Sequence, residues 1–211
     1  MFENIIKNVH NRHPLIHCIT NYVSINDCAN IVLACGGAPI MAEDINEVSQ
    51  ITSICQGLDI NIGMLNNNKL SSMLKAGATA NELGIPVILD PVGAGSSDYR
   101  IKAVQNLMSN VQFGVIRGNV SEIKAIAVKQ GIHNIAAGVY ETMQKDRSAM
   151  GVEAGVADKI TDDNIKEMAD FINKLSQKTG AVIAVTGGID MVADENRVYA
   201  IRNGHKMMSL V

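Results

Sequence analysis

Short apolar runs alternate with stretches of helical periodicity along most of this chain, and the alternation restricts its fold more than any other feature. Runs such as Pro86–Leu89, Phe113–Ile116 and Ala181–Val185 are apolar at nearly every position, and a polar residue follows each of them. Strands that are apolar on both faces are typical of a parallel sheet with helices on both sides. We therefore predict an α/β fold with a mostly parallel central sheet.

The segments between these runs have helical spacing of apolar residues and often end at glycine. We predict helices in the regions 24–35, 45–55, 70–78, 99–108 and 165–175, and further strands at 38–41 and 58–62. The apolar face of the third of these helices consists of Leu70, Met73, Leu74 and Ala78, and that of the last consists of Ile165, Met168, Ile172 and Leu175. Near the end, two apolar runs flank Asp194-Glu195-Asn196, which predicts a late β-hairpin at one edge of the sheet. Residues 131–159 fit neither pattern, and we expect a loop with some helix there.

Composition narrows the class of protein. Hydrophobic residues make up 47% and charged residues 18% of the 211 residues, which excludes a disordered chain and suits a single domain over residues 1–211. The formal net charge of −3 offers no basic surface for nucleic acid. Charged residues interrupt every apolar run before it reaches about 18 residues, so we expect no membrane-spanning helix.

The cysteines and the N-terminus indicate the compartment. All four cysteines lie between Cys18 and Cys55 without a C-x-x-C pair, so we predict reduced thiols, with Cys18, Cys28 and Cys35 as packing residues. The N-terminal residues 1–14 are polar and have no apolar core of an export signal. Together these features favour a cytoplasmic protein.

Polar side chains at the carboxyl ends of the predicted strands are the best candidates for chemistry, because ligands of open α/β sheets bind there. Asp90, Arg117, Asn119 and Thr186 stand at or just beyond such ends, and Glu122 follows shortly after. A guanidinium is well suited to bind phosphate, and one or two carboxylates can hold Mg²⁺. This set predicts a phosphate and metal site.

Purely structural interpretations remain open for several of these residues. Asn119-Val-Ser-Glu122 matches a helix capping box, although a capping glutamate can still face a metal. Asp90 before Pro91 could serve only to shape a turn. The glycine-rich stretch 93–97 lacks the lysine of a P-loop, so a plain loop is the better interpretation there.

Seven motifs in a fixed order make the chain recognisable as a whole. They are His17-Cys-Ile-Thr20-Asn21, Gly37-Ala-Pro-Ile-Met41, Asn61-Ile-Gly63, Leu89-Asp90-Pro-Val-Gly93-Ala-Gly95, Ile116-Arg117-Gly-Asn119-Val-Ser-Glu122, Val185-Thr186-Gly187 and Asn203-Gly-His205. From about residue 14 to the last residue, their order and spacing closely resemble the hydroxyethylthiazole kinases, thiamine-salvage enzymes of the ribokinase-like superfamily.

The resemblance implies a reaction and a set of partners. In that family the hydroxyl of 4-methyl-5-(2-hydroxyethyl)thiazole takes the γ-phosphoryl group of ATP in the presence of Mg²⁺. The family also implies a homotrimer with the thiazole near a subunit interface. Transferred position by position, the resemblance assigns Asn21, Met41 and Gly63 to the thiazole pocket, Arg117, Asn119 and Thr186 to ATP, and Asp90 and Glu122 to Mg²⁺.

The chain departs from the family pattern in two places. The stretch from about Ala136 to Lys159 is longer than usual, and Gly151-Val152-Glu153 is the expected counterpart of a family segment. The family continues past Asn-Gly-His with a Thr-Gly-x-Gly-Cys turn and several helices, whereas this sequence stops at Val211. We therefore expect the catalytic turn to lie beyond Val211 and the C-terminal helices to be absent from this chain.

Three hypotheses follow from this combination. The chain could be an incomplete sequence of an active thiazole kinase, or a short homologue that binds ligand without phosphorylating it. It could also be a kinase for another small alcohol of the superfamily, such as the pyrimidine precursor of thiamine. By resemblance, Met41 and the Thr20-Asn21-Tyr22 segment favour the thiazole.

Overall fold

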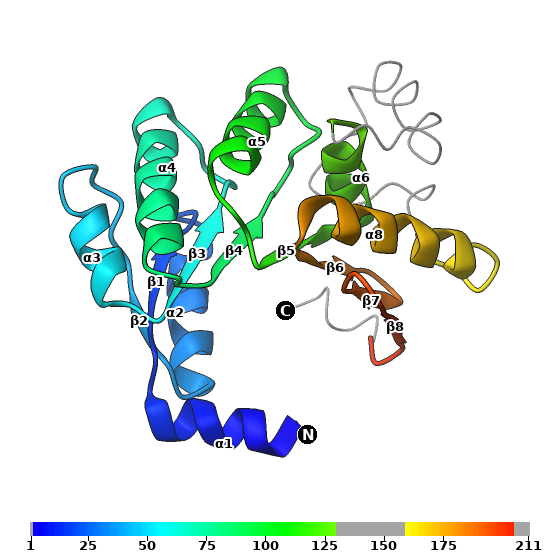
Figure 1. Ribbon diagram of the computed structural model, residues 1–211, viewed down its shortest axis with the longest axis horizontal. Coiled ribbons are helices and arrows are strands. Elements are labelled where there is room, and N and C mark those ends of the chain that lie inside the picture. The colour runs from blue at the N-terminus through cyan, green and yellow to red at the C-terminus, as the bar shows by residue number, and fades with distance from the viewer. Residues whose placement is uncertain (1, 130–158, 205–211) are drawn as a thin grey trace. The chain divides into compact units, whose positions relative to one another are not determined.

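A computed structural model describes residues 2–129 and 159–204 of the chain (Figure 1). Contacts between residues divide the chain into two compact units. The first unit contains Met1–Asp90 and Asn106–Gln112, and the second contains Pro91–Gln105 and Phe113–Val211. Most of residues 131–159, for which we predicted a loop with some helix, lie outside the described residues.

The first unit is a parallel α/β layer structure. Its strands are β1 (Leu15–Ile19), β2 (Ala38–Ile40), β3 (Gly57–Asn61) and β4 (Val87–Asp90), and its helices are α1 (Phe2–Arg12), α2 (Ile25–Ala34), α3 (Val48–Ile54) and α4 (Asn67–Glu82). The strands are ordered β2-β1-β3-β4, and each neighbouring pair is parallel. Consecutive residues of β1 and β3 are buried, so both faces of the sheet are covered here.

Strand β1 is absent from our predicted elements, because His17 interrupts its apolar run. The structure buries His17 completely. Its Nε2–H donates to the carbonyl oxygen of Ala42 at 2.8 Å, and its Nδ1 lies 2.9 Å from the hydroxyl of Thr52, which donates to it. Burial lowers the pKa of His17, against the opposing effects of the Ala42 hydrogen bond and Glu47. A neutral, fully bonded histidine therefore takes the place of an apolar residue in the strand.

Helix α4 was located correctly, but we expected the wrong face to be buried. Of Leu70, Met73, Leu74 and Ala78, the structure buries only Met73. The buried face consists of small or polar residues together with Met73, namely Lys69, Ser72, Met73, Ala76, Gly77 and Ala80. A Cβ at Gly77 would lie only 2.5 Å from a methyl carbon of Val111, so this face allows a closer approach than large side chains would. Helices α3 and α4 pack side by side (Figure 1).

The second unit contains the end of the strand series and the late hairpin. Strands β5 (Val115–Asn119) and β6 (Val182–Thr186) are parallel neighbours. Strand β7 (Asp190–Ala193) pairs antiparallel with β6, and β8 (Val198–Ile201) pairs antiparallel with β7. Its helices are α6 (Val120–Lys129) and α8 (Ile165–Thr179), and α5 (Asp98–Asn110) begins in this unit and ends with residues of the first. The predicted α/β class, mostly parallel strands and late hairpin are confirmed.

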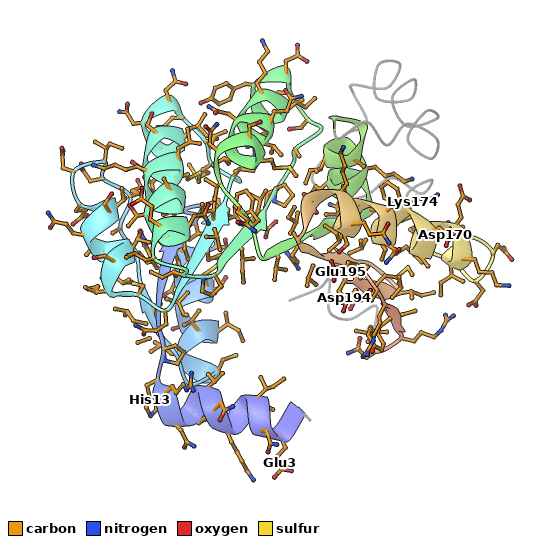
Figure 2. All side chains as sticks on the ribbon, viewed as in Figure 1. Glu3, His13, Asp170, Lys174, Asp194 and Glu195 are labelled. Atoms are coloured by element: carbon orange, nitrogen blue, oxygen red, sulfur yellow. The ribbon has the colours of Figure 1, made fainter. Side chains whose placement is uncertain are left out.

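Helix α8 shows how closely the sequence pattern predicts an amphipathic element. Its predicted stripe is buried at Met168, Ile172 and Leu175, and Gly180 ends it in the left-handed conformation with φ of 70°. The labelled Asp170 and Lys174 lie on its exposed side (Figure 2). Amide groups of Asn173 and Gln177 donate to the backbone carbonyls of Asp194 and Glu195 in the hairpin turn, at 2.9 and 3.1 Å.

The four cysteines are free thiols, as predicted. Cys18 and Cys55 are buried and Cys28 is half-buried, but Cys35 is exposed, so its assignment as a packing residue is wrong. Burial, with the nearby Asp59 carboxylate, raises the pKa of Cys18 to about 12, which makes it an unreactive thiol. Among the described residues, no helix combines the length and apolar character needed to cross a membrane.

Candidate functional site

Three polar side chains form a hydrogen-bonded series across the carboxyl ends of β1, β3 and β4. The amide nitrogen of Asn21 donates to Oδ1 of Asn61 at 3.2 Å, and the amide nitrogen of Asn61 donates to Oδ2 of Asp90 at 3.1 Å. Oδ1 of Asn21 also accepts hydrogen bonds from the backbone and hydroxyl of Ser24, each at 3.0 Å. The predicted site residues Asn21 and Asp90 are therefore connected through Asn61.

Gly63 completes this arrangement because only a residue without a side chain fits there. Its backbone N–H donates to Oδ1 of Asn61 at 2.8 Å. A Cβ at position 63 would lie 2.9 Å from both the amide nitrogen of Asn21 and Oδ1 of Asn61. The close approach of the backbone to two amides is the physical reason for glycine at this position.

Met41 is half-buried directly after β2, at the start of the loop that leads to α3. The next residue, Ala42, is buried and its carbonyl oxygen accepts the hydrogen bond from His17. The histidine of the first sequence motif therefore fixes the backbone beside Met41.

The same β2–α3 loop is joined to the start of α4 by an ion pair. Nζ of Lys69 lies 2.8 Å from Oε2 of Glu43, and the lysine side chain is only 3% exposed. Nζ also donates to the carbonyl oxygen of Thr20 and lies 4.6 Å from the ring centroid of Tyr22. The hydroxyl of Tyr22 donates to the other oxygen of Glu43. We call Tyr22, Glu43 and Lys69 the lysine cluster.

The carboxylate of Glu43 is held in its charged form within this cluster. Burial alone would raise its pKa, but the hydrogen bonds from Lys69 and Tyr22 and the charge of Lys69 together lower it. The hydrogen bond to Glu43 raises the pKa of the Tyr22 phenol. The cluster is thus an ion pair with a neutral hydroxyl donor.

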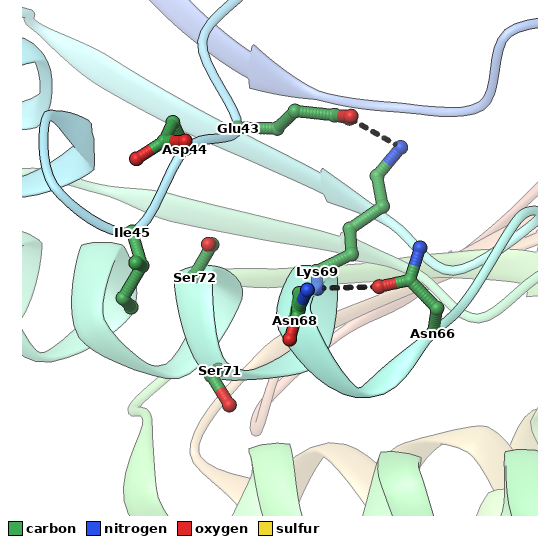
Figure 3. Close-up of a pocket in the computed structure, with 8 residues that line it drawn as sticks. All are labelled: Glu43, Asp44, Ile45, Asn66, Asn68, Lys69, Ser71 and Ser72. Carbon is green, nitrogen blue, oxygen red and sulfur yellow. Dashed lines mark hydrogen bonds and ion pairs between the residues drawn. The ribbon is translucent and has the colours of Figure 1, made fainter.

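A pocket of about 550 Å³ opens beside the lysine cluster, as Figure 3 shows. It is lined by the β2–α3 loop and the first two turns of α4, with Glu43, Asp44, Ile45, Asn66, Asn68, Lys69, Ser71 and Ser72. The side chain of Asn66 caps α4 by accepting the backbone N–H of Lys69 at 2.8 Å. This cap fixes the backbone of the first turn of α4 at Lys69, from which the lysine side chain extends.

In the second unit, Asn119 and Glu122 form the predicted capping box at the start of α6. Oδ1 of Asn119 accepts the backbone N–H of Glu122 at 2.9 Å, and Oε2 of Glu122 accepts the backbone N–H of Asn119 at 2.8 Å. Oε1 of Glu122 accepts the backbone N–H of Gly93 at 2.9 Å. A carboxylate has about four lone-pair sites, so these two hydrogen bonds leave Glu122 able to bind a further cation.

The glycine-rich loop after β4 is built as a plain turn, in agreement with our preferred interpretation. The backbone N–H groups of Ala94 and Ser96 donate to the carbonyls of Pro91 and Gly93, each at 2.9 Å. Gly93 adopts a φ of +64°, and its own N–H is bound by Glu122. These three amides are therefore already used inside the protein.

The residues predicted to bind ATP meet at the carboxyl ends of β5 and β6. Asn119 and Thr186 are paired in register, and the hydroxyl of Thr186 donates to the carbonyl oxygen of Gly118 at 3.4 Å. Arg117 precedes them on β5 and is exposed, so water can solvate its charge. The backbone of Gly204 also lies near this point, since a Cβ there would be 3.4 Å from the carbonyl oxygen of Gly188. His205 of the same motif lies outside the described residues.

The eight predicted site residues are thus divided between the units. Asn21, Gly63 and Asp90 are brought together in the first unit, and Asn119, Thr186 and Glu122 gather in the second. Within residues 2–129 and 159–204, no three histidine, cysteine or acidic side chains form a metal cluster. Since Mg²⁺ often takes only one or two carboxylates, the joint assignment of Asp90 and Glu122 stays a prediction.

Sequence reasoning did not assign the bridging role of Asn61 or the lysine cluster. Asn61 belongs to a recognised motif, and its position at the end of β3 was the available signal. The signal for Lys69 was weaker, because its three partners lie 26 to 49 residues away in the sequence.

Comparison with known proteins identifies the family. The model of the family described as "Hydroxyethylthiazole kinase family" matches residues 6–211 of this chain. The chain is 52% identical to the hydroxyethylthiazole kinase of Clostridium acetobutylicum and 44% identical to that of Desulfovibrio desulfuricans. Both matches include 100% of this chain, and they span 71% and 68% of those relatives.

Solved structures agree with the sequence matches. The hydroxyethylthiazole kinase of Pyrococcus horikoshii is 31% identical, with a TM-score of 0.80 over 98% of this chain and 68% of that one. A phosphomethylpyrimidine kinase from Clostridium difficile, at 13% identity, has a TM-score of 0.58 over 90% of this chain and 85% of its own, and shares the fold alone. The protein therefore belongs to the hydroxyethylthiazole kinase family, a family of kinases with the ribokinase-like α/β fold.

Proposed function

We propose that the protein phosphorylates the hydroxyl group of 4-methyl-5-(2-hydroxyethyl)thiazole with ATP, as a step of thiamine salvage. Family membership gives the reaction, and the arrangement of Asn21, Asn61 and Asp90 at the strand ends is the observation that most supports it. Phosphoryl transfer requires positioning and charge stabilisation more than covalent chemistry. The roles proposed below are therefore those of binding and orientation.

The first unit supplies the thiazole pocket in this proposal. Asn21 and Gly63 form a polar edge of this pocket. Asn61 and Ser24 orient the side-chain amide of Asn21, and Asn61 also binds the backbone N–H of Gly63. Met41 offers a polarizable thioether that packs well against an aromatic heterocycle. A pocket of fixed geometry would hold the substrate hydroxyl in line for attack on phosphorus.

The second unit supplies the nucleotide side. The exposed guanidinium of Arg117 is able to reach a phosphate and offset its charge. Asn119 and Thr186 stand next to each other in register at the same strand ends and would bind the nucleotide. The capping box fixes the backbone around Asn119, so its position is set before the ligand arrives.

The resemblance assigns Asp90 in the first unit and Glu122 in the second to Mg²⁺, which when bound supplies positive charge that neutralises the phosphates. Glu122 fits this role, because its two backbone hydrogen bonds orient the carboxylate and leave lone pairs for a cation or its waters. Asp90 accepts a hydrogen bond from Asn61, which orients its carboxylate at the end of β4.

The direct test is an assay of ATP-dependent phosphorylation with purified protein, Mg²⁺ and the thiazole alcohol, with the product detected by mass spectrometry. We expect formation of the thiazole phosphate and its loss in excess EDTA. Arg117→Ala should raise KM for ATP about tenfold and change KM for the thiazole little. Phosphorylation of the thiamine pyrimidine alcohol in preference to the thiazole would contradict the proposal. Thiazole binding in calorimetry without turnover would identify a homologue that only binds ligand.

We also propose a homo-oligomer, a trimer by resemblance to the family, located in the cytoplasm. Helix α2 is mostly apolar yet has no buried residue, and Val23 just before it is 89% exposed. Exposed apolar surface of this extent is typical of an interface. The cytoplasmic location is supported by the four free thiols.

A further inference from the structure

Burying the cation of the lysine cluster costs free energy, and this cost suggests that the cluster has a function. The side chain of Lys69 is 3% exposed, and an ammonium group withdrawn from water to this extent needs compensation. Nζ receives it from the carboxylate of Glu43, the carbonyl oxygen of Thr20 and the ring face of Tyr22. A methionine or leucine could fill the same space on α4 without this cost.

The contacts of Lys69 join three segments that are remote in sequence. Thr20 and Tyr22 lie on either side of Asn21 in the loop after β1, and Glu43 lies two residues after Met41 in the loop after β2. The third segment, residues 63–69, begins at Gly63 and ends at Lys69 in the first turn of α4. Each of the three segments therefore contains one residue that we assign to the thiazole pocket.

We propose that Lys69 is a positioning residue that holds these three segments, and with them Asn21, Met41 and Gly63, in the arrangement that binds the thiazole alcohol. The proposal rests on the proposed function for the identity of the ligand. Its structural part, the restraint on the two loops, is independent of that function.

The main experiment compares Lys69→Met with the wild-type protein. The variant keeps most of the length of the side chain but removes the charge, so Glu43 loses its ion-pair partner and keeps only the hydrogen bond from Tyr22. We expect KM for the thiazole to rise about tenfold, while kcat falls less than about threefold and KM for ATP stays within about twofold. Lys7→Met is the control, since Lys7 is an exposed lysine of the same unit whose ion pair is with Glu3 on its own helix, away from both loops. It should leave all three constants unchanged.

Hydrogen exchange tests the restraint without reference to activity. Amides of residues 20–24 and 41–45 should exchange faster in Lys69→Met than in the wild type and in Lys7→Met. If the wild type does not phosphorylate the thiazole, the proposed function fails while this measurement still decides the role of Lys69. Unchanged exchange in both loops, or an unchanged KM for the thiazole, would overturn the proposal.

Two further measurements guard against a variant that does not fold. Glu43→Gln removes the ion pair from the partly exposed partner and should raise KM for the thiazole about threefold; an unchanged value would count against the proposal. In Lys69→Ala, the adjoining pocket gives a small amine access to the vacated space. Propylammonium should lower the KM of this variant toward the wild-type value, whereas tetramethylammonium, which has no N–H donor, should not. Equal effects of the two cations would contradict a role for the ammonium contacts.

Discussion

At the scale of single residues, the first unit depends on polar side chains that are buried and fully bonded. His17, Asn61 and Lys69 are each less than 10% exposed, and each binds groups from other segments of the chain. Leaving such a group without its partner costs more than the hydrogen bond itself contributes. Small substitutions around these residues should therefore affect both stability and ligand binding.

Gly63→Ala is the clearest case. The added methyl group would lie 2.9 Å from two amide atoms, so Asn21 and Asn61 must move apart. We expect a loss of about 1–3 kcal/mol in the free energy of unfolding and a higher KM for the thiazole. Urea unfolding measures the first, with Gly188→Ala as control, because a Cβ at that glycine meets nothing within 4 Å. Equal stability of the two variants would show that the site relaxes without cost.

His17 predicts a dependence of stability on pH. Its pKa is lowered in the folded protein, mainly by burial, whereas the unfolded chain has the ordinary value of about 6.5. Below that pH the unfolded state binds a proton that the folded state does not. The contribution of His17 is thus complete above pH 6.5 and is lost as the pH falls toward the lowered pKa, by up to about 1.4 kcal/mol per pH unit.

Urea unfolding between pH 5.5 and 7.5 measures this effect. The variant His17→Gln should be less stable than the wild type at pH 7.5, but its stability should change less over the same interval. A variant with the same pH slope as the wild type would assign the effect to other groups.

At the scale of elements, the start of α6 depends on a reciprocal cap. Asn119→Ala removes the acceptor for the backbone N–H of Glu122 and should cost about 1 kcal/mol of stability. Asn119→Asp keeps an acceptor at the same place and should stay within about 0.5 kcal/mol of the wild type. Thermal unfolding compares the two, and an equal loss in both would show that the amide nitrogen of Asn119, not its oxygen, matters.

Helix α2 is the element that predicts assembly. Ile31 is 61% exposed on it, and Ile31→Glu should disrupt an interface and shift the protein to a smaller species. Tyr199→Glu is the control, because Tyr199 is an equally prominent side chain, 56% exposed, on strand β8. Light scattering during gel filtration measures the mass. A wild-type protein that is already monomeric at micromolar concentration would refute the proposed oligomer.

The elements also show where sequence reasoning succeeded. The hairpin, the α8 stripe and the capping box follow from local periodicity and short-range hydrogen bonds, and all are confirmed. Strands β4 and β6 end within one residue of the predicted runs, whereas β5 continues to Asn119, three residues beyond the predicted run. Strand β1 was missed because a histidine can be buried only when distant partners, here Thr52 and Ala42, satisfy its ring. The buried face of α4 was wrong because Gly77 faces Val111, a contact that local spacing does not contain. The roles of Asn61 and Lys69 depend on partners that are remote in the sequence, so local patterns could not predict them.

At the scale of the whole molecule, the proposed ligands are divided between the two units. The thiazole should protect amides near residues 21, 41 and 63 from hydrogen exchange, and ATP should protect those near 117–122 and 186–188. This follows because the proposed contacts of each ligand lie within one unit. Exchange measured with each ligand alone checks the division, and protection by the thiazole confined to the second unit would reverse our assignment.

The short segment Asn106–Gln112 determines where a fragment that contains the first unit should end. It belongs to the first unit although the residues on both sides of it belong to the second. Its Val111 fills the space beside Gly77, and Gln112 exchanges two backbone hydrogen bonds with the side chain of Asn81, at 2.7 and 2.9 Å. A fragment ending at residue 90 would therefore lack Val111 and have an unfilled cavity beside Gly77 on α4. A fragment ending at residue 112 includes Val111 and would keep this contact. The natural cutting point for an autonomous first half lies after Gln112, more than twenty residues beyond the end of its last strand.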